Sequence, residues 1–202
     1  MKTAYWIGYE LLGSIARAFF GLRIKDRDKL IEDGPVLLVA NHQSFVDPPF
    51  IGNIYYDDIY FLARKTLFKG IFKPIYTSWQ AIPIDQDAPD MTSLKKIIAL
   101  LKQGEKVLVF PEGSRTPDGE VHDAMPGIGL ILNKAKVPVQ PVRIFGAYEA
   151  LPMGKGLPRR HPISITIGDP VDYTSEELSA KGKDAYQHLA DKAMDAIRRL
   201  TP

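Results

Sequence analysis

Short runs of apolar residues, each the length of a β-strand, recur along the chain. They cover residues 36–40, 59–63, 81–84, 106–110, 137–145 and 163–167. Segments with apolar positions at helical spacing separate them, near residues 48–56, 66–79, 91–103 and 126–136. Strands that alternate with helices predict an α/β fold. Because the runs are continuous, we expect strands buried on both faces, in a single domain with a mostly parallel twisted sheet flanked by helices.

The C-terminal segment carries a strong helix signal. Thr174 and Glu177 have the spacing of a capping box, in which each side chain accepts a hydrogen bond from the other's backbone N–H. Apolar positions then recur at helical spacing, at Tyr186, Leu189, Ala193, Ile197 and Leu200. We therefore expect a final helix that starts at this capping box.

The N-terminal segment has an amphipathic pattern over residues 3–22. On a helical projection the polar positions fall within about a third of the circumference, and they are Lys2, Thr3, Glu10, Gly13, Ser14 and Arg17. The opposite face carries Ile7, Leu11, Leu12, Ile15, Ala18, Phe19 and Leu22. With the cations that follow at 23–29, this predicts a membrane-interface helix in a membrane-associating segment, residues 1–30, ahead of a domain of residues 31–202. A helix packed on its own domain is the alternative.

Composition narrows the function classes. The chain contains no cysteine, which excludes disulfides, thiolate catalysis and Cys-ligated metal. Its net charge of +2, with no nucleic-acid motif, argues against nucleic-acid binding. A helix that spans a membrane needs about 18 uninterrupted apolar residues, and no stretch of the sequence reaches that length. Glu10 and Arg17 interrupt the N-terminal apolar stretch and no cleavage pattern follows, so we expect a protein on the reducing, cytosolic side.

Positive charge is concentrated in two segments. Residues 59–84 contain four cations and no acid, with aromatic side chains interleaved, and residues 133–168 contain six cations and one acid. Such a surface suits anionic lipid head groups, which attract each nearby cation with about 1 kcal/mol.

A polar loop follows the first apolar run, in the sequence VLLVANHQSFVDPPF. Asp47 followed by Pro48 predicts a helix start capped by the aspartate. Residues 41–46 then form a loop at the carboxyl end of a strand, where ligands bind in open α/β sheets. There Asp47 can hold one ring nitrogen of His42 protonated and leave the other as a base. A surface histidine beside a helix cap is the alternative.

A second polar loop ends the run at 106–110, in the sequence KVLVFPEGSRT. Gly113 permits a tight or positive-φ turn, which would leave backbone N–H groups to face a ligand. Arg115 offers a planar fork of donors for phosphate or carboxylate. Glu112 could orient that arginine or accept a substrate hydroxyl. A β-turn with a surface Glu–Arg pair is the alternative, but two such loops at two strand ends predict one composite site.

Four blocks carry a resemblance to a known family. In order and spacing, NHQSFVD, FLARKTLFKG, FPEGSRT and VPVQPVRI resemble the glycerolipid (lysophospholipid) acyltransferase family, over about residues 35–170. The resemblance implies transfer of an acyl group from a thioester, on CoA or acyl carrier protein, to a hydroxyl of a lysophospholipid. The acceptor that it implies is 1-acylglycerol-3-phosphate, which gives phosphatidic acid.

The resemblance also implies roles for particular residues. His42 and Asp47 match the catalytic pair of the His-x4-Asp motif. The residues that match the substrate-binding side are Lys65, Glu112, Gly113, Ser114 and Arg115. Gln86 stands where family members commonly carry an arginine. Because glutamine lacks a charged fork, either Lys65 and Arg115 hold the acceptor phosphate or the acceptor is a different lipid.

The residue inventory favours direct acyl transfer over a covalent acyl-enzyme. The chain has no cysteine and no Gly-x-Ser-x-Gly turn. We expect His42 to remove the proton of the attacking hydroxyl and Asp47 to stabilise the imidazolium. Backbone donors for the oxyanion would come from the helix start at Pro48 or from the Gly113 turn. No metal and no cofactor is expected, since the thioester is a co-substrate.

The expected partners are the lysophospholipid, the acyl thioester, acyl carrier protein as one possible donor, and an anionic membrane surface, with no nucleic acid. We expect a peripheral or monotopic protein on the cytoplasmic face of the cell (inner) membrane. Two other classes remain open from the residues alone. One is a serine hydrolase that uses Ser44 or Ser114, and the other is a non-catalytic lipid-binding module.

Overall fold

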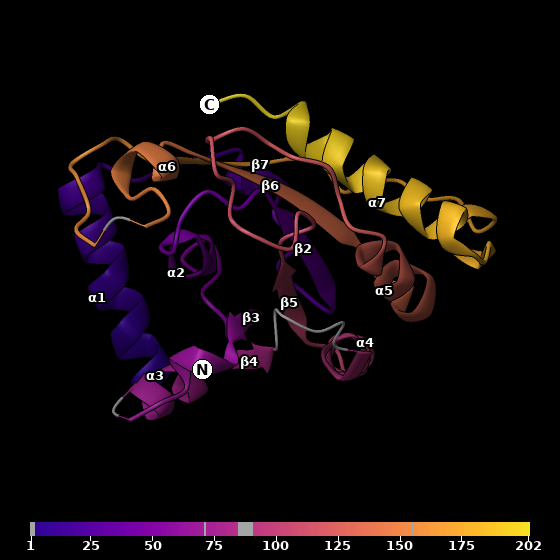
Figure 1. The fold of residues 1–202 in the computed structure, drawn as a ribbon, viewed down its shortest axis with the longest axis horizontal. Coiled ribbons are helices and arrows are strands. Elements are labelled where there is room, and N and C mark those ends of the chain that lie inside the picture. Colours follow the sequence, from indigo (N-terminus) through magenta and orange to yellow (C-terminus); the bar gives the residue numbers. More distant parts are fainter. Residues whose placement is uncertain (1–2, 71, 85–90, 155) are drawn as a thin grey trace.

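The structure is a computed structural model of the 202-residue chain. It describes residues 3–70, 72–84, 91–154 and 156–202. Within these residues a seven-stranded sheet lies between two helical layers (Figure 1).

The sheet is almost wholly parallel. Its strands are β1 (Arg23–Lys25), β2 (Val36–Ala40), β3 (Tyr60–Arg64), β4 (Ala81–Ile84), β5 (Lys106–Val109), β6 (Val139–Phe145) and β7 (Ser164–Ile167). They are ordered β1-β7-β6-β2-β5-β3-β4, and only β6 and β7 pair antiparallel. The predicted α/β fold is thus confirmed, and each predicted apolar run overlaps a strand. The sequence pattern missed β1, because this strand has one apolar residue between two cations.

Helices cover both faces of the sheet. They are α1 (Thr3–Phe20), α2 (Asp47–Gly52), α3 (Phe72–Ser78), α4 (Met91–Lys102), α5 (Gly127–Ala135), α6 (Ala147–Ala150) and α7 (Lys183–Arg198), with 3-10 turns η1 (Arg27–Lys29), η2 (Lys65–Leu67) and η3 (Glu177–Ser179). Leu38 of the central strand packs with α1 and α2, whereas its neighbours Leu37 and Val39 pack with α4, α5 and α7. This alternation explains why β2 is a continuous, fully buried apolar run.

Two of the predicted helices differ in extent from the helices of the structure, and one helix of the structure was not predicted. The helix expected at 48–56 ends at Gly52. The helix expected at 66–79 is divided into η2 and α3, and Gly70 between them has a positive φ of 53°, which ends helical geometry. The missed helix, α6, has four residues, too few to show a helical period.

The helix α1 packs on the domain with one narrow strip. Its buried residues Gly13, Ala16 and Phe20 face α2, where the Phe20 ring lies 5.4 Å from the Phe50 ring. Gly13, which the sequence pattern placed on the polar face, belongs to this packed strip because any side chain there would collide with Asn53. The sequence alternative of packing on its own domain therefore holds for this strip.

A second strip of α1 is apolar and exposed. Leu11, Ile15 and Phe19 recur every four residues and are 59%, 45% and 43% exposed. Among the described residues, no helix is long and apolar enough to cross a membrane.

The capping box forms, but it does not start the final helix. Thr174 Oγ1 accepts from Glu177 N–H at 3.1 Å, and Glu177 Oε2 accepts from Thr174 N–H at 2.7 Å. These bonds begin η3, and α7 starts only at Lys183. The expected start was wrong because the Asn133 side chain donates to the carbonyls of Leu178 and Ala180, which end the turn there.

Glu177 makes a testable contribution to acid stability. Lys192, the Thr174 N–H and His188 bond its carboxylate and lower its pKa from 4.5 to about 2. A lowered carboxyl pKa adds stability above the unfolded value, and this stability is lost as the pH falls from 4.5 towards 2. Glu177→Gln should therefore flatten the decline of the urea midpoint over that range, whereas the exposed neighbour variant Glu176→Gln should follow the wild type. A wild-type slope in Glu177→Gln would contradict this role.

Candidate active site

The predicted site residues gather at one edge of the sheet. Because β2, β5 and β3 are parallel neighbours, their carboxyl ends lie side by side. His42 follows β2, residues 110–116 follow β5, and Lys65 directly follows β3. Gln86, after β4, lies outside the described residues.

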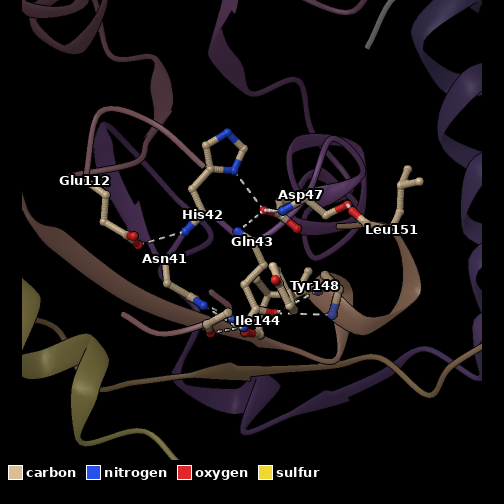
Figure 2. Close-up of polar contacts among 11 residues, drawn as sticks. Asn41, His42, Gln43, Asp47, Glu112, Ile144, Tyr148 and Leu151 are labelled. Atoms are coloured by element: carbon tan, nitrogen blue, oxygen red, sulfur yellow. Dashed lines mark hydrogen bonds and ion pairs between the residues drawn. The ribbon is translucent and has the colours of Figure 1, made fainter. Parts of the chain in front are cut away.

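A histidine and an aspartate form the centre of the site. His42 Nδ1 lies 2.8 Å from Asp47 Oδ2 (Figure 2). The imidazole is 17% exposed and the carboxylate is fully buried. Since Nδ1 faces the carboxylate, we assign the ring proton to Nδ1. The opposite nitrogen, which Figure 2 shows pointing away from Asp47, is then free to accept a proton.

The Asp47 carboxylate stabilises the loop instead of capping α2. Oδ2 also accepts from the backbone N–H groups of Gln43 and Ser44, each at 2.6 Å. The N-cap position belongs to Val46, and no side-chain cap bond forms, so the predicted aspartate cap is wrong. Burial raises the pKa of Asp47, while the His42 bond and the two N–H groups oppose that shift by favouring the ionised form.

Glu112 joins the two polar loops. Its Oε1 accepts from the His42 backbone N–H at 2.9 Å, and its Oε2 lies 3.5 Å from the His122 backbone nitrogen. Burial raises the pKa of Glu112, and these two N–H groups act against that shift. The carboxylate thus fixes the backbone of His42. Of the two roles that the sequence left open for Glu112, the orientation of Arg115 is not observed, since no ion pair of Arg115 occurs in the described part of the chain. Its contact with a substrate stays a prediction.

Phe110 packs against the face of the His42 ring. The rings of Phe110 and His42 stack with centroids 3.9 Å apart and planes 15° apart. An aromatic face packed against the imidazole restricts its rotation. Sequence reasoning used Phe110 as the end of an apolar run and as the first residue of the FPEGSRT block, and gave it no role of its own. The contact depends on β2 and β5 being neighbours.

Two amide side chains of the His42 loop, Asn41 and Gln43, bond it to other segments of the chain. Asn41 donates to the Ile144 carbonyl and accepts from the Ile144 N–H, each at 2.9 Å. Gln43 accepts from the Ala147 N–H and donates to the Gly119 carbonyl. These bonds, some of which are visible in Figure 2, join the loop to segments that are distant in sequence. Asn41 and Ile144 are 103 residues apart, and Gln43 and Gly119 are 76 residues apart. Local sequence spacing carries no signal for them.

The geometry disfavours the serine hydrolase alternative. Ser44 is fully buried, and its hydroxyl donates to the Leu151 carbonyl at 2.7 Å. A nucleophilic serine needs its proton directed at a base. Ser114 is exposed on the turn after Gly113, and within the described residues neither hydroxyl bonds to a histidine.

The Gly113 turn lies against the His42 loop. Gly113 has a φ of 74°, and a side chain there would collide with the Met125 sulfur. The Thr116 N–H donates to the His42 carbonyl at 2.8 Å, which closes the turn onto the loop. Ser114 is exposed and Arg115 is half-buried on this rim. Lys65 is exposed at the same sheet edge.

The described residues contain no group of three or more His, Asp or Glu side chains that could hold a metal ion. The fold and site define a class: an α/β protein with a His–Asp pair and a polar glycine turn at the carboxyl edge of its parallel sheet.

A family model described as Acyltransferase matches residues 21–145, and the chain belongs to this family. Among its relatives, 1-acyl-sn-glycerol-3-phosphate acyltransferase of Bacillus subtilis (strain 168) is 30% identical over 157 residues, which cover 75% of this chain and 74% of the relative. The enzyme of the same name from Streptococcus pneumoniae is 30% identical over 172 residues, which cover 84% of this chain and 61% of the relative.

The fold likeness extends over nearly the whole chain. The crystal structure of the 1-acyl-sn-glycerophosphate (LPA) acyltransferase PlsC from Thermotoga maritima matches with a TM-score of 0.74 and 26% identity, covering 98% of this chain and 81% of that one. The family resemblance found in the sequence is thus confirmed. The protein is an O-acyltransferase, and the non-catalytic alternative is set aside.

Proposed function

We propose that the protein transfers an acyl group from a thioester to the free hydroxyl of 1-acylglycerol-3-phosphate and so forms phosphatidic acid. The observation that carries this proposal is the His42–Asp47 contact of 2.8 Å, which leaves the other ring nitrogen as a base at the sheet edge. The named activity of the relatives from B. subtilis and S. pneumoniae supports the choice of acceptor. The donor is acyl-CoA or acyl carrier protein.

The reaction is a direct transfer. The free nitrogen of His42 takes the proton of the acceptor hydroxyl as its oxygen attacks the thioester carbonyl. The buried Asp47 carboxylate stabilises the imidazolium that forms. Collapse of the tetrahedral intermediate breaks the C–S bond, and the thiolate leaves and takes the proton from His42. The new C–O bond is the ester of the product, and the enzyme returns to its starting state.

Backbone bonding favours the Gly113 turn as the source of oxyanion donors. The N–H groups of Gln43 and Ser44 are used by Asp47. The start of α2 offers little, because Pro48 and Pro49 have no N–H. In the turn, the Gly113 N–H donates to the Phe110 carbonyl at 3.0 Å, whereas the Ser114 and Arg115 N–H groups donate to no acceptor within the described residues. Of the two sources that the sequence left open, these two N–H groups of the turn are therefore the better supported.

Arg115 is proposed to bind the acceptor phosphate. It is half-buried on the rim, and its guanidinium is not consumed by an ion pair within the described residues. Arg115→Ala should raise the KM for lysophosphatidate by about 10- to 100-fold, the effect of losing a charge-assisted hydrogen bond. The KM for the thioester should change less than about twofold. Arg115→Lys keeps the charge without the fork and should fall between the two. Steady-state kinetics that show equal effects on both substrates would contradict this role.

The membrane is the proposed place of the reaction, on its cytoplasmic face. The acceptor is a lipid, and the exposed apolar strip of Leu11, Ile15 and Phe19 on α1 suits the head-group layer of a bilayer. The exposed cations Arg64, Lys65 and Lys69 add attraction to anionic lipid.

The acceptor assignment is tested by a thiol-release assay with palmitoyl-CoA against a panel of lysophospholipids. Because the chain has no cysteine, a thiol reagent reports only the released CoA. Lysophosphatidate should give the fastest acceptor-dependent release. A faster rate with a lysophospholipid that bears a head group would overturn the assignment and leave acyl transfer itself standing.

A further inference from the structure

A loop after α6 carries the most exposed large apolar side chain in the described part of the chain. Leu157 is 84% exposed, and Met153 in the same loop is 49% exposed. The Arg159 N–H donates to the Ala150 carbonyl at 2.7 Å and closes the loop at its base. We call residues 151–154 and 156–160 the Leu157 loop. A single exposed leucine is common on protein surfaces. Whether Leu157 marks a binding surface therefore depends on the residues around it.

The charged side chains of the Leu157 loop are all positive. They are Arg159 and Arg160, and both are exposed. The sequence of residues 151–163 contains no acidic residue. An exposed apolar side chain with two exposed cations in the same loop matches the chemistry of an anionic bilayer, which offers hydrocarbon beneath a layer of phosphates.

The Leu157 loop connects the His42 loop, which is the catalytic loop of the proposed function, with α1. At its start, the Leu151 carbonyl accepts from the Ser44 hydroxyl at 2.7 Å. After its end, the Ile163 N–H donates to the carbonyl of Phe20, the last residue of α1, at 3.0 Å. The segment that contains Leu157 is therefore anchored at one end to the catalytic loop and at the other to the helix with the exposed apolar strip. Figure 1 shows α6 and this segment on the side of the sheet where α1 lies.

We propose that the Leu157 loop is a second contact with an anionic bilayer, in which Leu157 enters the head-group layer and Arg159 and Arg160 bind lipid phosphates. The occupant follows from the positive charge of the loop and from the backbone bond that links its following segment to α1, the helix with the exposed apolar strip. The inference rests on the proposed function at a membrane. It adds that a bilayer contact is coupled to the catalytic loop through the bond between Ser44 and Leu151.

Vesicle binding of the full chain tests the proposal. Wild type, Leu157→Ser and Arg159→Ser/Arg160→Ser are sedimented with vesicles of phosphatidylcholine and with vesicles that also contain phosphatidylglycerol. Leu157→Ser should weaken binding to both by about tenfold, the scale of burying most of one leucine. The double variant should lose about 30-fold on the anionic vesicles only. Met91→Ser is the matched control. Met91 is apolar and 52% exposed, and it lies on α4, which covers the opposite face of the sheet, so this variant should bind like wild type.

A position-specific readout separates the loop from the rest of the membrane proposal. Since the chain has no cysteine, Leu157→Cys and Met91→Cys can each be labelled at one site with an environment-sensitive fluorophore. Anionic vesicles should raise the emission at position 157 and leave position 91 unchanged. Binding of wild type with a silent label at 157 would overturn the loop proposal alone and favour a protein partner there. No vesicle binding by wild type would overturn both membrane proposals, while thiol release with lysophosphatidate reports separately on the acyl transfer.

Discussion

Replacing His42 with alanine should lower the rate of acyl transfer by about 10²- to 10⁴-fold, the usual effect of losing a general base. The acceptor and donor KM values should change little, since the ring acts on the proton rather than on binding. The fold should survive, because the imidazole is partly exposed and its contacts are one bond to Asp47 and one stack on Phe110. Thiol-release kinetics and circular dichroism measure the two halves of this prediction.

His122 provides the matched control. Among the described residues it forms the other His–Asp pair, with Nε2 2.9 Å from Asp118 Oδ1, but both side chains are about half exposed. Its bond to Glu112 uses the backbone N–H, which His122→Ala retains. His122→Ala should therefore keep most of the activity. A folded His42→Ala variant that keeps most of its activity would exclude His42 as the base.

Asp47→Asn should be nearly as damaging to the rate. Asparagine can place its carbonyl oxygen where Oδ2 lies and still accept the three bonds from the loop, but it cannot supply the charge that stabilises the imidazolium. We expect a loss of about 10²- to 10⁴-fold in kcat with a near-native urea midpoint.

Asp47→Ala separates catalysis from loop stability. It leaves the N–H groups of Gln43 and Ser44 without their buried acceptor, at a cost of about 1–3 kcal/mol for each group. This variant should therefore be both inactive and clearly less stable than Asp47→Asn. Full activity in a folded Asp47→Asn variant would show that the carboxylate charge has no part in the reaction.

Local patterns predicted most of the fold. A five-residue apolar run such as Val36–Ala40 has one stable place, in the middle of a sheet covered on both sides, and it lies there. The pattern failed where a distant contact decides the outcome. The capping box at Thr174 looked like the start of α7, yet bonds from Asn133, about 45 residues earlier, end the turn at Ala180.

The contacts of the candidate site also divide into those that local spacing predicts and those that depend on distant parts of the chain. The contact between His42 and Asp47 was predictable, because a short loop joins them. The direction of the Asp47 carboxylate, back into the loop rather than over α2, was not, since a helix-start aspartate normally caps. The roles of Asn41, Phe110 and Glu112 depend on the order of the strands, which brings β5 to one side of β2 and β6 to the other. Single-sequence spacing does not contain that order.

The most direct test of His42-driven acyl transfer to lysophosphatidate is the stoichiometry of the products. Wild type and His42→Ala are incubated with an odd-chain acyl-CoA and an even-chain lysophosphatidate, and released thiol and mixed-chain phosphatidic acid are quantified from the same samples. For wild type, one molecule of mixed-chain phosphatidic acid should form for each thiol, and His42→Ala should form less than about a hundredth as much of both. Thiol release without phosphatidic acid, or equal product from both proteins, would contradict a His42-driven transfer to this acceptor.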